Sequence, residues 1–316
     1  MKGDFTMKET NSIIIGIDHG NASIKTNTSF ECKSGFTVLN DEPIIQKGLL
    51  KYQSKYYSVG AERFPVKMDK TIDEDFFIIT LAAVAESLGS TTEYNSVKGK
   101  DIILSVGLPI VNYGRMKERF RSYFIRNNIQ YKYEGKEYLI NIKDCFVFPQ
   151  SYSALLTRFS EYRDVPLVNV CDIGGGTTDC FKMENGIINI SSCFSLPLGA
   201  IHLFNSIAQE VLARGYYLIE SQIQQIILGK QPVFEDEGIS KIVRETTERF
   251  TGRILSQIGE HGLELKLNPT VFVGGGSILL KRFIEESKIG YTEIIEDPFA
   301  NAKGFEMLAR QKLLKR

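Results

Sequence analysis

The chain has 316 residues, of which 43% are hydrophobic and 24% are charged, and its formal net charge is zero. A neutral chain argues against tight, sequence-independent binding to nucleic acid, which needs many phosphate-neutralising cations. No apolar run has the length of a membrane-spanning helix, and the N-terminus has no signal-peptide core. The length suits two domains of ordinary size.

The cysteines are an odd set with no C-x-x-C spacing, and four of the five lie in apolar, strand-like runs. They are therefore predicted to be reduced core residues, in a protein of the cytoplasm. The five are Cys32, Cys145, Cys171, Cys180 and Cys193.

Residues 1–11 are polar and predict a mobile leader. A buried strand follows at 13–17 and ends at Asp18, and a glycine-containing turn and a second strand come next. In this turn His19 is interpreted as a turn residue only. Gly20, Asn21 and Ser23 can offer donors to phosphate and Lys25 a cation, although a turn-forming Asn21 and a solvated Lys25 explain the pattern equally well.

Hydrophobic periodicity predicts the rest of the first half as an α/β pattern. The expected elements are a β-rich insert at 30–66, a helix from Asp73, a strand at 102–106, a helix around 116–124 and a strand at 138–148. Gln150 follows that last strand where a new helix begins. Residues that orient a nucleophilic water are common at such a place, and a helix cap is the alternative.

The stretch 172–179 reads Asp-Ile-Gly-Gly-Gly-Thr-Thr-Asp and follows an apolar strand at 168–171. A second strand pair is expected around Asn185-Gly186, since both residues of that turn favour φ > 0. Packing explains three consecutive glycines poorly, whereas backbone N–H groups that close on an anion explain them well. Asp172 and Asp179 would repel a bare phosphate, so the pattern implies a divalent cation.

The remaining chain is predicted to hold a helical insert at about 200–260, a strand at 269–273 and an amphipathic helix at 301–314. A third glycine-rich turn, Gly274 to Ser277, joins that strand to a helix. It permits close approach of a flat or anionic ligand, with tight strand–helix packing as the alternative.

Walker A and G-x-G-x-x-G motifs are absent, which disfavours P-loop enzymes and dinucleotide oxidoreductases. The turns at Asp18-His-Gly-Asn21, at 172–179 and at 274–277 resemble, in order and spacing, the two phosphate motifs and the adenosine motif of the actin/heat-shock ATPase/sugar kinase superfamily. Gly107-Leu-Pro109 and the segment Asp297–Gly304 are similar to bacterial plasmid-segregating actins of the ParM type.

The resemblance implies an α/β actin-like fold of two ribonuclease-H-like domains that flank a nucleotide cleft. Domain I would span 12–165, with the insert at 30–66 and the C-terminal helix 298–316 packed back on it. Domain II would span 166–297 and contain the helical insert at 200–260.

ATP or ADP and Mg²⁺ are the implied cofactors. The resemblance gives catalytic roles to Asp172, Gln150 and Asp18, and metal contacts to Asp18, Asp172 and Asp179. ParM-type proteins usually carry Glu where Gln150 stands, and Gln can orient water but cannot take its proton, so the general base is left open. The residues implied in nucleotide binding are Gly20, Asn21, Ser23, Lys25, Gly174, Gly175, Gly176, Thr177, Thr178, Gly274, Gly275, Gly276 and Ser277.

The expected function is a cytoplasmic, ATP-driven filament with slow Mg-dependent hydrolysis, used to segregate a plasmid or another DNA element. Its partners would be further copies of the same chain and a DNA-binding adaptor, with no direct contact to nucleic acid or membrane. A sugar kinase-like phosphotransferase and an FtsA- or MreB-like cytoskeletal role are the alternatives.

Overall fold

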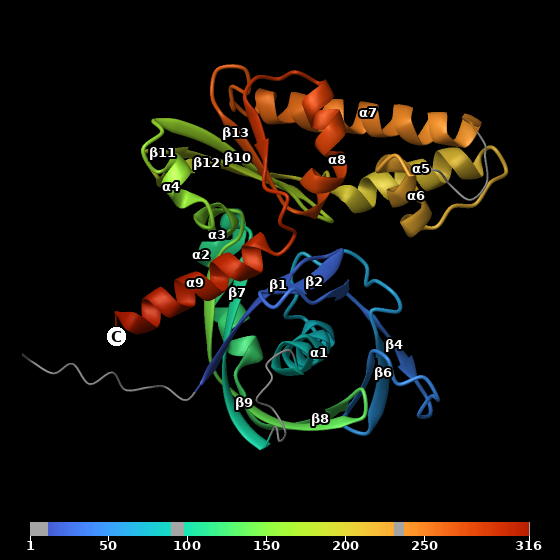
Figure 1. Ribbon diagram of the computed structural model, residues 1–316, viewed down its shortest axis with the longest axis vertical. Helices are drawn as coiled ribbons and strands as arrows, with labels where there is room; N and C mark the ends of the chain where they lie inside the picture. Colours follow the sequence, from blue (N-terminus) through green and yellow to red (C-terminus); the bar gives the residue numbers. More distant parts are fainter. Residues whose placement is uncertain (1–11, 90–97, 231–236, 316) are drawn as a thin grey trace, which may run out of the picture.

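The computed structural model describes residues 12–89, 98–230 and 237–315, and the predicted leader at 1–11 lies outside them. Within the described chain the strands form two sheets, one of nine strands and one of five. Figure 1 shows the two sheets one above the other, with helices packed around each. The chain is therefore a mixed α/β protein, as predicted.

The larger sheet has the order β3-β2-β1-β7-β9-β8-β5-β6-β4. Its centre is parallel, because β1 pairs with β7 and β7 with β9 in the same direction, so their carboxyl ends reach one edge. The sheet curls around helix α1, Asp75–Gly89, as Figure 1 shows. Its strands are β1 Ile13–His19, β2 Ser23–Thr26, β3 Glu31–Lys33, β4 Phe36–Leu39, β5 Leu49–Tyr52, β6 Lys55–Val59, β7 Lys98–Leu108, β8 Arg126–Tyr133 and β9 Lys136–Pro149.

The predicted insert at 30–66 does form strands, but they extend the larger sheet. The connection is β8, a strand absent from the prediction, which pairs with both β5 and β9. Its buried residues Ile129, Tyr131 and Tyr133 alternate with more exposed ones, so a period-two signal was present in the sequence.

The smaller sheet has the order β12-β11-β10-β13-β14. Strands β10, Leu167–Ile173, and β11, Thr178–Glu184, are antiparallel, and β13, Thr270–Val273, runs parallel to β10. The predicted hairpin between β11 and β12, Ile187–Leu196, is confirmed, and both of its turn residues have positive φ (Asn185 49°, Gly186 79°). The edge strand β14, Thr292–Ile294, was not predicted.

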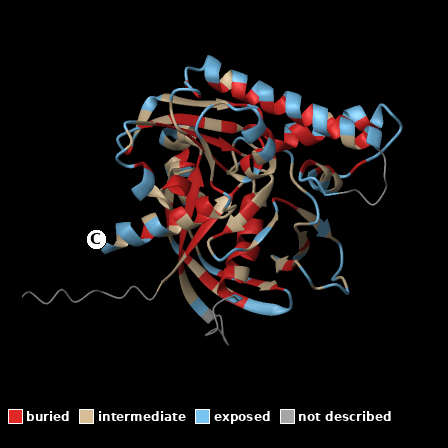
Figure 2. Ribbon diagram, turned by 45° about the horizontal axis from the view of Figure 1, so that its top comes forward, coloured by how far each residue is buried: buried red, intermediate tan, exposed pale blue. Residues whose placement is uncertain are grey.

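Among the described residues, the helices α5 Ala200–Leu212, α6 Glu220–Ile227, α7 Glu237–Glu260 and α8 Gly275–Glu286 pack on the smaller sheet. Helix α7 is buried along its inner face and exposed along its outer face (Figure 2), as expected of an amphipathic surface helix. The side chains of these helices share one apolar core with those of β10 and β13.

The remaining helices are α2 Ile110–Phe124, α3 Tyr152–Leu156, α4 Phe159–Tyr162 and α9 Ala300–Leu314. Helix α4 packs against the smaller sheet, whereas α9 packs against strands of the larger one. Glycines let α9 approach its neighbours. A Cβ on Gly304 would lie 1.9 Å from the Ser153 carbonyl oxygen, and one on Gly16 would lie 2.1 Å from that of Ala302. The C-terminal helix is thereby embedded against β1 and α3.

Candidate functional site

Three turns at the carboxyl ends of β1, β10 and β13 line a cleft of about 450 Å³. The first turn belongs to the larger sheet and the other two to the smaller one. The volume lies in the range of small-molecule and cofactor sites. Fifteen of the predicted site residues line the cleft: Asp18, Gly20, Asn21, Ser23, Lys25, Gln150, Asp172, Gly174, Gly175, Gly176, Thr177, Asp179, Gly274, Gly275 and Gly276.

Two predicted residues point elsewhere. Thr178 is fully buried and its hydroxyl donates to the carbonyl oxygen of Leu198. Ser277 is also fully buried, and its hydroxyl donates to the carbonyl oxygen of Val273 within helix α8. Neither side chain lines the cleft, because each turns into the core of the smaller sheet and its helices.

The turns of the two sheets touch each other. A Cβ on Gly175 would lie 2.7 Å from the Ala22 Cβ atom, and one on Gly176 would lie 2.9 Å from Val66. We expected packing to explain these glycines poorly, and that interpretation was wrong, since only glycine allows so close an approach.

The same glycines also leave donors available. The N–H groups of Gly175 and Gly176 have no hydrogen-bond partner in the described part of the chain, whereas Gly174 donates to the Thr177 carbonyl oxygen at 2.8 Å. Free, adjacent backbone N–H groups in a turn can bind an anion.

In the third turn, Gly274 to Ser277, the glycines serve both tight strand–helix packing and close approach of a ligand. A Cβ on Gly274 (φ 89°) would lie 2.2 Å from Asp172 Oδ1, and one on Gly276 would lie 2.5 Å from the Ile173 carbonyl oxygen, so these two glycines allow tight packing. Gly275 faces the cleft, where a Cβ would lie 3.9 Å from Lys25 Nζ. Helix α8 begins here and directs its positive N-terminal end to the cleft.

Three of the carboxylates that line the cleft belong to the predicted site. Asp172 and Asp179 are register partners on β10 and β11, and Asp18 is the second-to-last residue of β1, on the opposite side of the cleft. Asp18 accepts a hydrogen bond from Gln150 Nε2 at 2.8 Å. Asp179 accepts one from the Thr177 hydroxyl at 2.8 Å, while its other oxygen, Oδ1, is buried without a partner.

Burial raises the pKa of Asp172 to about 7, and the nearby charges of Asp179 and Asp18 add to the effect. Burial likewise raises the pKa of Asp179, although the Ser195 and Thr177 hydroxyls and the charge of Lys70 act against it. Carboxyl groups with raised pKa values, gathered in a cleft, are typical of functional sites.

Lys70 is a cleft residue that the sequence analysis missed. Its ammonium group donates to the His19 carbonyl oxygen and lies 5.3 Å from the centre of the Phe76 ring. No carboxylate of the described chain lies within ion-pair distance, and burial lowers the pKa of Lys70 to about 8, against the raising effects of Asp18 and Asp179. The segment around Lys70 matches no motif, so nothing in the sequence distinguished it from a surface lysine.

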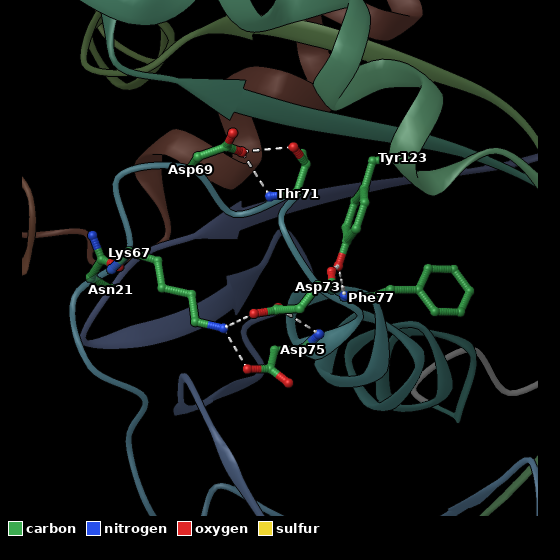
Figure 3. A network of polar contacts seen from close by, with 8 residues as sticks. All are labelled: Asn21, Lys67, Asp69, Thr71, Asp73, Asp75, Phe77 and Tyr123. Carbon is green, nitrogen blue, oxygen red and sulfur yellow. Dashed lines mark hydrogen bonds and ion pairs between the residues drawn. The ribbon is translucent and has the colours of Figure 1, made fainter.

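A network of polar contacts holds the segment that carries Lys70 (Figure 3). Asn21 Oδ1 accepts a hydrogen bond from the Lys67 backbone N–H at 3.0 Å, and the Lys67 ammonium pairs with Asp73 and Asp75 at the start of α1. Tyr123 on α2 donates its hydroxyl to the Asp73 carbonyl oxygen at 2.8 Å. Asn21 thus connects the first turn of the cleft to the segment 66–73.

Lys25 and Ser23 both line the cleft and both contact Glu31 on the neighbouring strand β3. The Lys25 ammonium lies 3.1 Å from a Glu31 carboxylate oxygen and donates to the Ser23 hydroxyl at 2.6 Å. Ser23 in turn donates to Glu31 at 2.7 Å. The predicted phosphate-binding cation is therefore already paired in this structure.

His19 is not the turn residue that the sequence predicted. It ends β1 and is fully buried, its ring stacks on Phe124 with centroids 4.9 Å apart, and Nε2 lies 2.8 Å from the Thr80 hydroxyl. Burial, with a contribution from Lys70, lowers the pKa of His19 to about 3, so the ring is neutral.

The donors of the cleft fit a magnesium nucleotide better than a bare metal ion. The described residues contain no group of three or more His, Cys, Asp and Glu side chains able to hold a metal by themselves. Mg²⁺ in nucleotide sites takes one or two carboxylates and completes its shell with phosphate oxygens and water. The partnerless Asp179 oxygen and the free glycine N–H groups suit such a ligand.

Comparison with known proteins agrees with this geometry. A family profile described as archaeal actin homologue MreB-like, C-terminal, matches residues 170–286. No curated protein sequence matches the chain. Among the described helices, none is long and apolar enough to cross a membrane.

Solved structures match over nearly the whole chain. The archaeal actin homolog Ta0583 in complex with ADP gives a TM-score of 0.74 at 20% identity and covers 95% of this chain and 99% of its own. A 15-stranded ParM filament from Clostridium botulinum gives 0.75 at 19% identity, covering 95% and 99%. ParM of Bacillus thuringiensis with ATP gives 0.68 at 15% identity, covering 96% and 100%. The chain has the actin-like fold.

Proposed function

We propose that the chain binds ATP with Mg²⁺ in this cleft, hydrolyses it slowly and polymerises into filaments. The observation that carries the proposal is the meeting of glycine turns from both sheets around Asp18 and Asp172. Further support comes from similar structures, which include one with ADP, one with ATP and one filament.

We divide the chain into an actin-like domain at 12–165 and a second at 166–297, with the C-terminal helix against the first. The proposed boundary falls between α4 and β10, where the chain passes from the larger sheet to the smaller one. A ligand held by turns of both domains favours a closed cleft, since it contacts the two sides only when they are close.

Within the cleft, the N–H groups of Gly175 and Gly176 would hold phosphate oxygens, and Gly275 with the α8 N-terminus would face the nucleoside. Asp18, Asp172 and Asp179 would hold Mg²⁺, partly through water. The bound Mg-nucleotide supplies the phosphoryl group and part of the charge neutralisation. Positioning and charge neutralisation carry most of phosphoryl transfer.

Lys25 and Lys70 would face developing negative charge from two sides. Lys70 has donors left after its bond to His19. Lys25 would exchange Glu31 for phosphate oxygens. Gln150, bonded to Asp18, would orient the attacking water, and because an amide takes no proton, we assign proton acceptance to Asp172.

The proposal extends to the biological role of the filament. A filament of this type would move plasmids or other DNA elements in the cytoplasm, linked to DNA by a separate adaptor protein. A heterologous interface that does not close into a ring is what yields filaments.

The test is 90° light scattering and pelleting of the purified chain with Mg-ATP, Mg-ADP or Mg-GTP. Mg-ATP should give sedimentable polymer that disassembles as phosphate is released. Absence of polymer over a wide concentration range would refute the filament, and sugar-stimulated turnover would favour a phosphotransferase instead. Asp172→Ala should still bind nucleotide but lose hydrolysis and give stable filaments.

A further inference from the structure

The segment Asp297–Gly304 carries a buried asparagine whose amide joins two parts of the cleft. Asn301 lies in the first turn of α9 with 7% of its surface exposed. Its Oδ1 accepts a hydrogen bond from the Ser151 backbone N–H at 2.9 Å, and its Nδ2 lies 3.3 Å from Asp172 Oδ2. A backbone N–H can only donate and an ionised carboxylate can only accept, so the amide has one allowed orientation.

Ser151 reaches the same carboxylate oxygen. Its hydroxyl donates to Asp172 Oδ2 at 3.1 Å, and its backbone has φ 65°, a conformation that non-glycine residues rarely adopt. The preceding residue, Gln150, donates to Asp18. Two consecutive side chains of one strained turn therefore bond the aspartates on the two sides of the cleft.

Helix α9 holds Asn301 in a fixed place. Gly304 lies against the Ser153 carbonyl oxygen, and the Phe305 ring fills the space where a Gly107 side chain would stand, 2.0 Å from its Cβ position. The Ser105 hydroxyl donates to the Phe305 carbonyl oxygen at 2.7 Å. Such tight packing leaves little freedom for the amide.

We propose that Asn301 is a positioning residue, which fixes the Asp172 carboxylate and the Gln150–Ser151 turn together. The proposal rests on the proposed ATPase function. Asn301 would act through Asp172, in the way that outer-shell partners orient ligating carboxylates. The C-terminal helix, which packs against α3, β1 and β7 (Figure 1), would thereby help to position a carboxylate of the cleft.

The first test compares ATP turnover and nucleotide affinity of the full chain with those of three variants. Asn301→Ala and Ser151→Ala each remove one donor to Asp172 Oδ2, and we expect kcat to fall roughly 10- to 100-fold with less than about 3-fold change in nucleotide Kd. Because both act on one oxygen, the double variant should lose less than the product of the two single effects.

The variant Asn301→Asp distinguishes a positioning role of Asn301 from a merely structural one. Aspartate keeps the acceptor for the Ser151 N–H but loses the donor to Asp172, so a merely structural role predicts near-normal turnover. Our proposal predicts lower turnover than in Asn301→Ala. Asn169→Ala is the matched control, since Asn169 is a buried asparagine on β10 that donates to Thr270 and does not contact Asp172. Its turnover should match that of the wild type.

A second test needs no activity. In nucleotide-free protein, Asn301→Ala should lower the urea midpoint of unfolding less when position 172 is already Ala, whereas the effect of Asn169→Ala should be the same in both backgrounds. Equal effects of Asn301→Ala in both backgrounds would overturn the proposal. If the wild-type chain does not hydrolyse ATP, the proposed function fails, and this measurement still decides whether Asn301 holds Asp172.

Discussion

At the residue scale, burial sets the chemistry of the cleft. Asp172 and Lys70 carry opposite charges when ionised. Burial raises the pKa of Asp172 to about 7 and lowers the pKa of Lys70 to about 8. Desolvation disfavours the charged form of either group, so each needs a charged ligand or partner to be fully ionised. A metal–phosphate ligand offers a cation to Asp172 and an anion to Lys70.

The raised pKa of Asp172 predicts a pH dependence of stability. A carboxyl group whose folded pKa exceeds its unfolded value of 3.8 stabilises the fold fully at low pH, and this stabilisation is lost as pH rises through 7. The comparison uses protein free of nucleotide and metal. The unfolding free energy of the wild type, minus that of Asp172→Asn, should therefore fall by up to about 4 kcal/mol between pH 4 and pH 8.

Urea unfolding at several pH values measures this difference. His19, whose pKa is lowered to about 3, titrates with the opposite effect on stability, but it is present in both proteins and cancels in the subtraction. A difference that does not change with pH would show that the carboxyl titrates normally.

Removing the charge of Lys70 should reduce ATP turnover. Lys70→Met keeps the length of the side chain and removes the charge, so ATP turnover should fall by about 100-fold, the loss typical for one preorganised electrostatic donor. Steady-state phosphate release measures it. The control is Lys55→Met, an exposed lysine on β6, which should leave turnover unchanged.

At the element scale, glycines determine how closely helices, strands and turns approach one another. Helix α9 packs against β1 and α3 through Gly16 and Gly304, and the turns of the two sheets meet through Gly175 and Gly176. Each contact joins backbone to backbone or to a short side chain. The glycine-rich turns are thus packing devices as well as sources of free N–H groups.

Two helical glycines should respond to alanine in opposite ways. At Gly304 the new Cβ would meet the Ser153 backbone at 1.9 Å, so Gly304→Ala should destabilise the fold by about 2–3 kcal/mol through overpacking. Gly252 in α7 has open space around it, so Gly252→Ala should stabilise by roughly 0.5–1 kcal/mol through helix propensity. Urea denaturation of both variants is the measurement, and equal signs would contradict the packing described for α9.

At the scale of the whole molecule, the cleft exists because two sheets place their turns face to face. A ligand that bonds to both sides should stabilise the folded chain as a unit. Saturation with ATP at 100 times its Kd should add about 2.7 kcal/mol to the unfolding free energy.

Gly175→Ala should reduce this gain. Its Cβ would lie 2.7 Å from Ala22 across the cleft, so the two turns must separate and nucleotide should bind more weakly. In Gly174→Ala the nearest contact is 3.3 Å, to Thr177 of the same turn, and this control should keep most of the ATP-dependent stabilisation. Thermal unfolding with and without Mg-ATP compares them, and equal gains would show that the contact between the turns does not matter for binding.

The sequence by itself determined most strands, most helices and the turns that line the cleft. These features depend on local patterns: apolar runs for β1 and β10, Asn185-Gly186 for the hairpin, and helical spacing for α1 and α7. The edge strand β14 was missed because it has only three residues, and the insert at 30–66 was not seen to extend the larger sheet because strand pairing is non-local.

Only the tertiary structure decided which side chains face the ligand and which support them. Lys70, Ser151 and Asn301 stand in segments that match no nucleotide motif, and they reach the cleft because α1, α3 and α9 pack where they do. Thr178 and Ser277 belong to the predicted motifs but turn into the core. The direction of a side chain depends on packing between residues far apart in the sequence, and no local pattern encodes it.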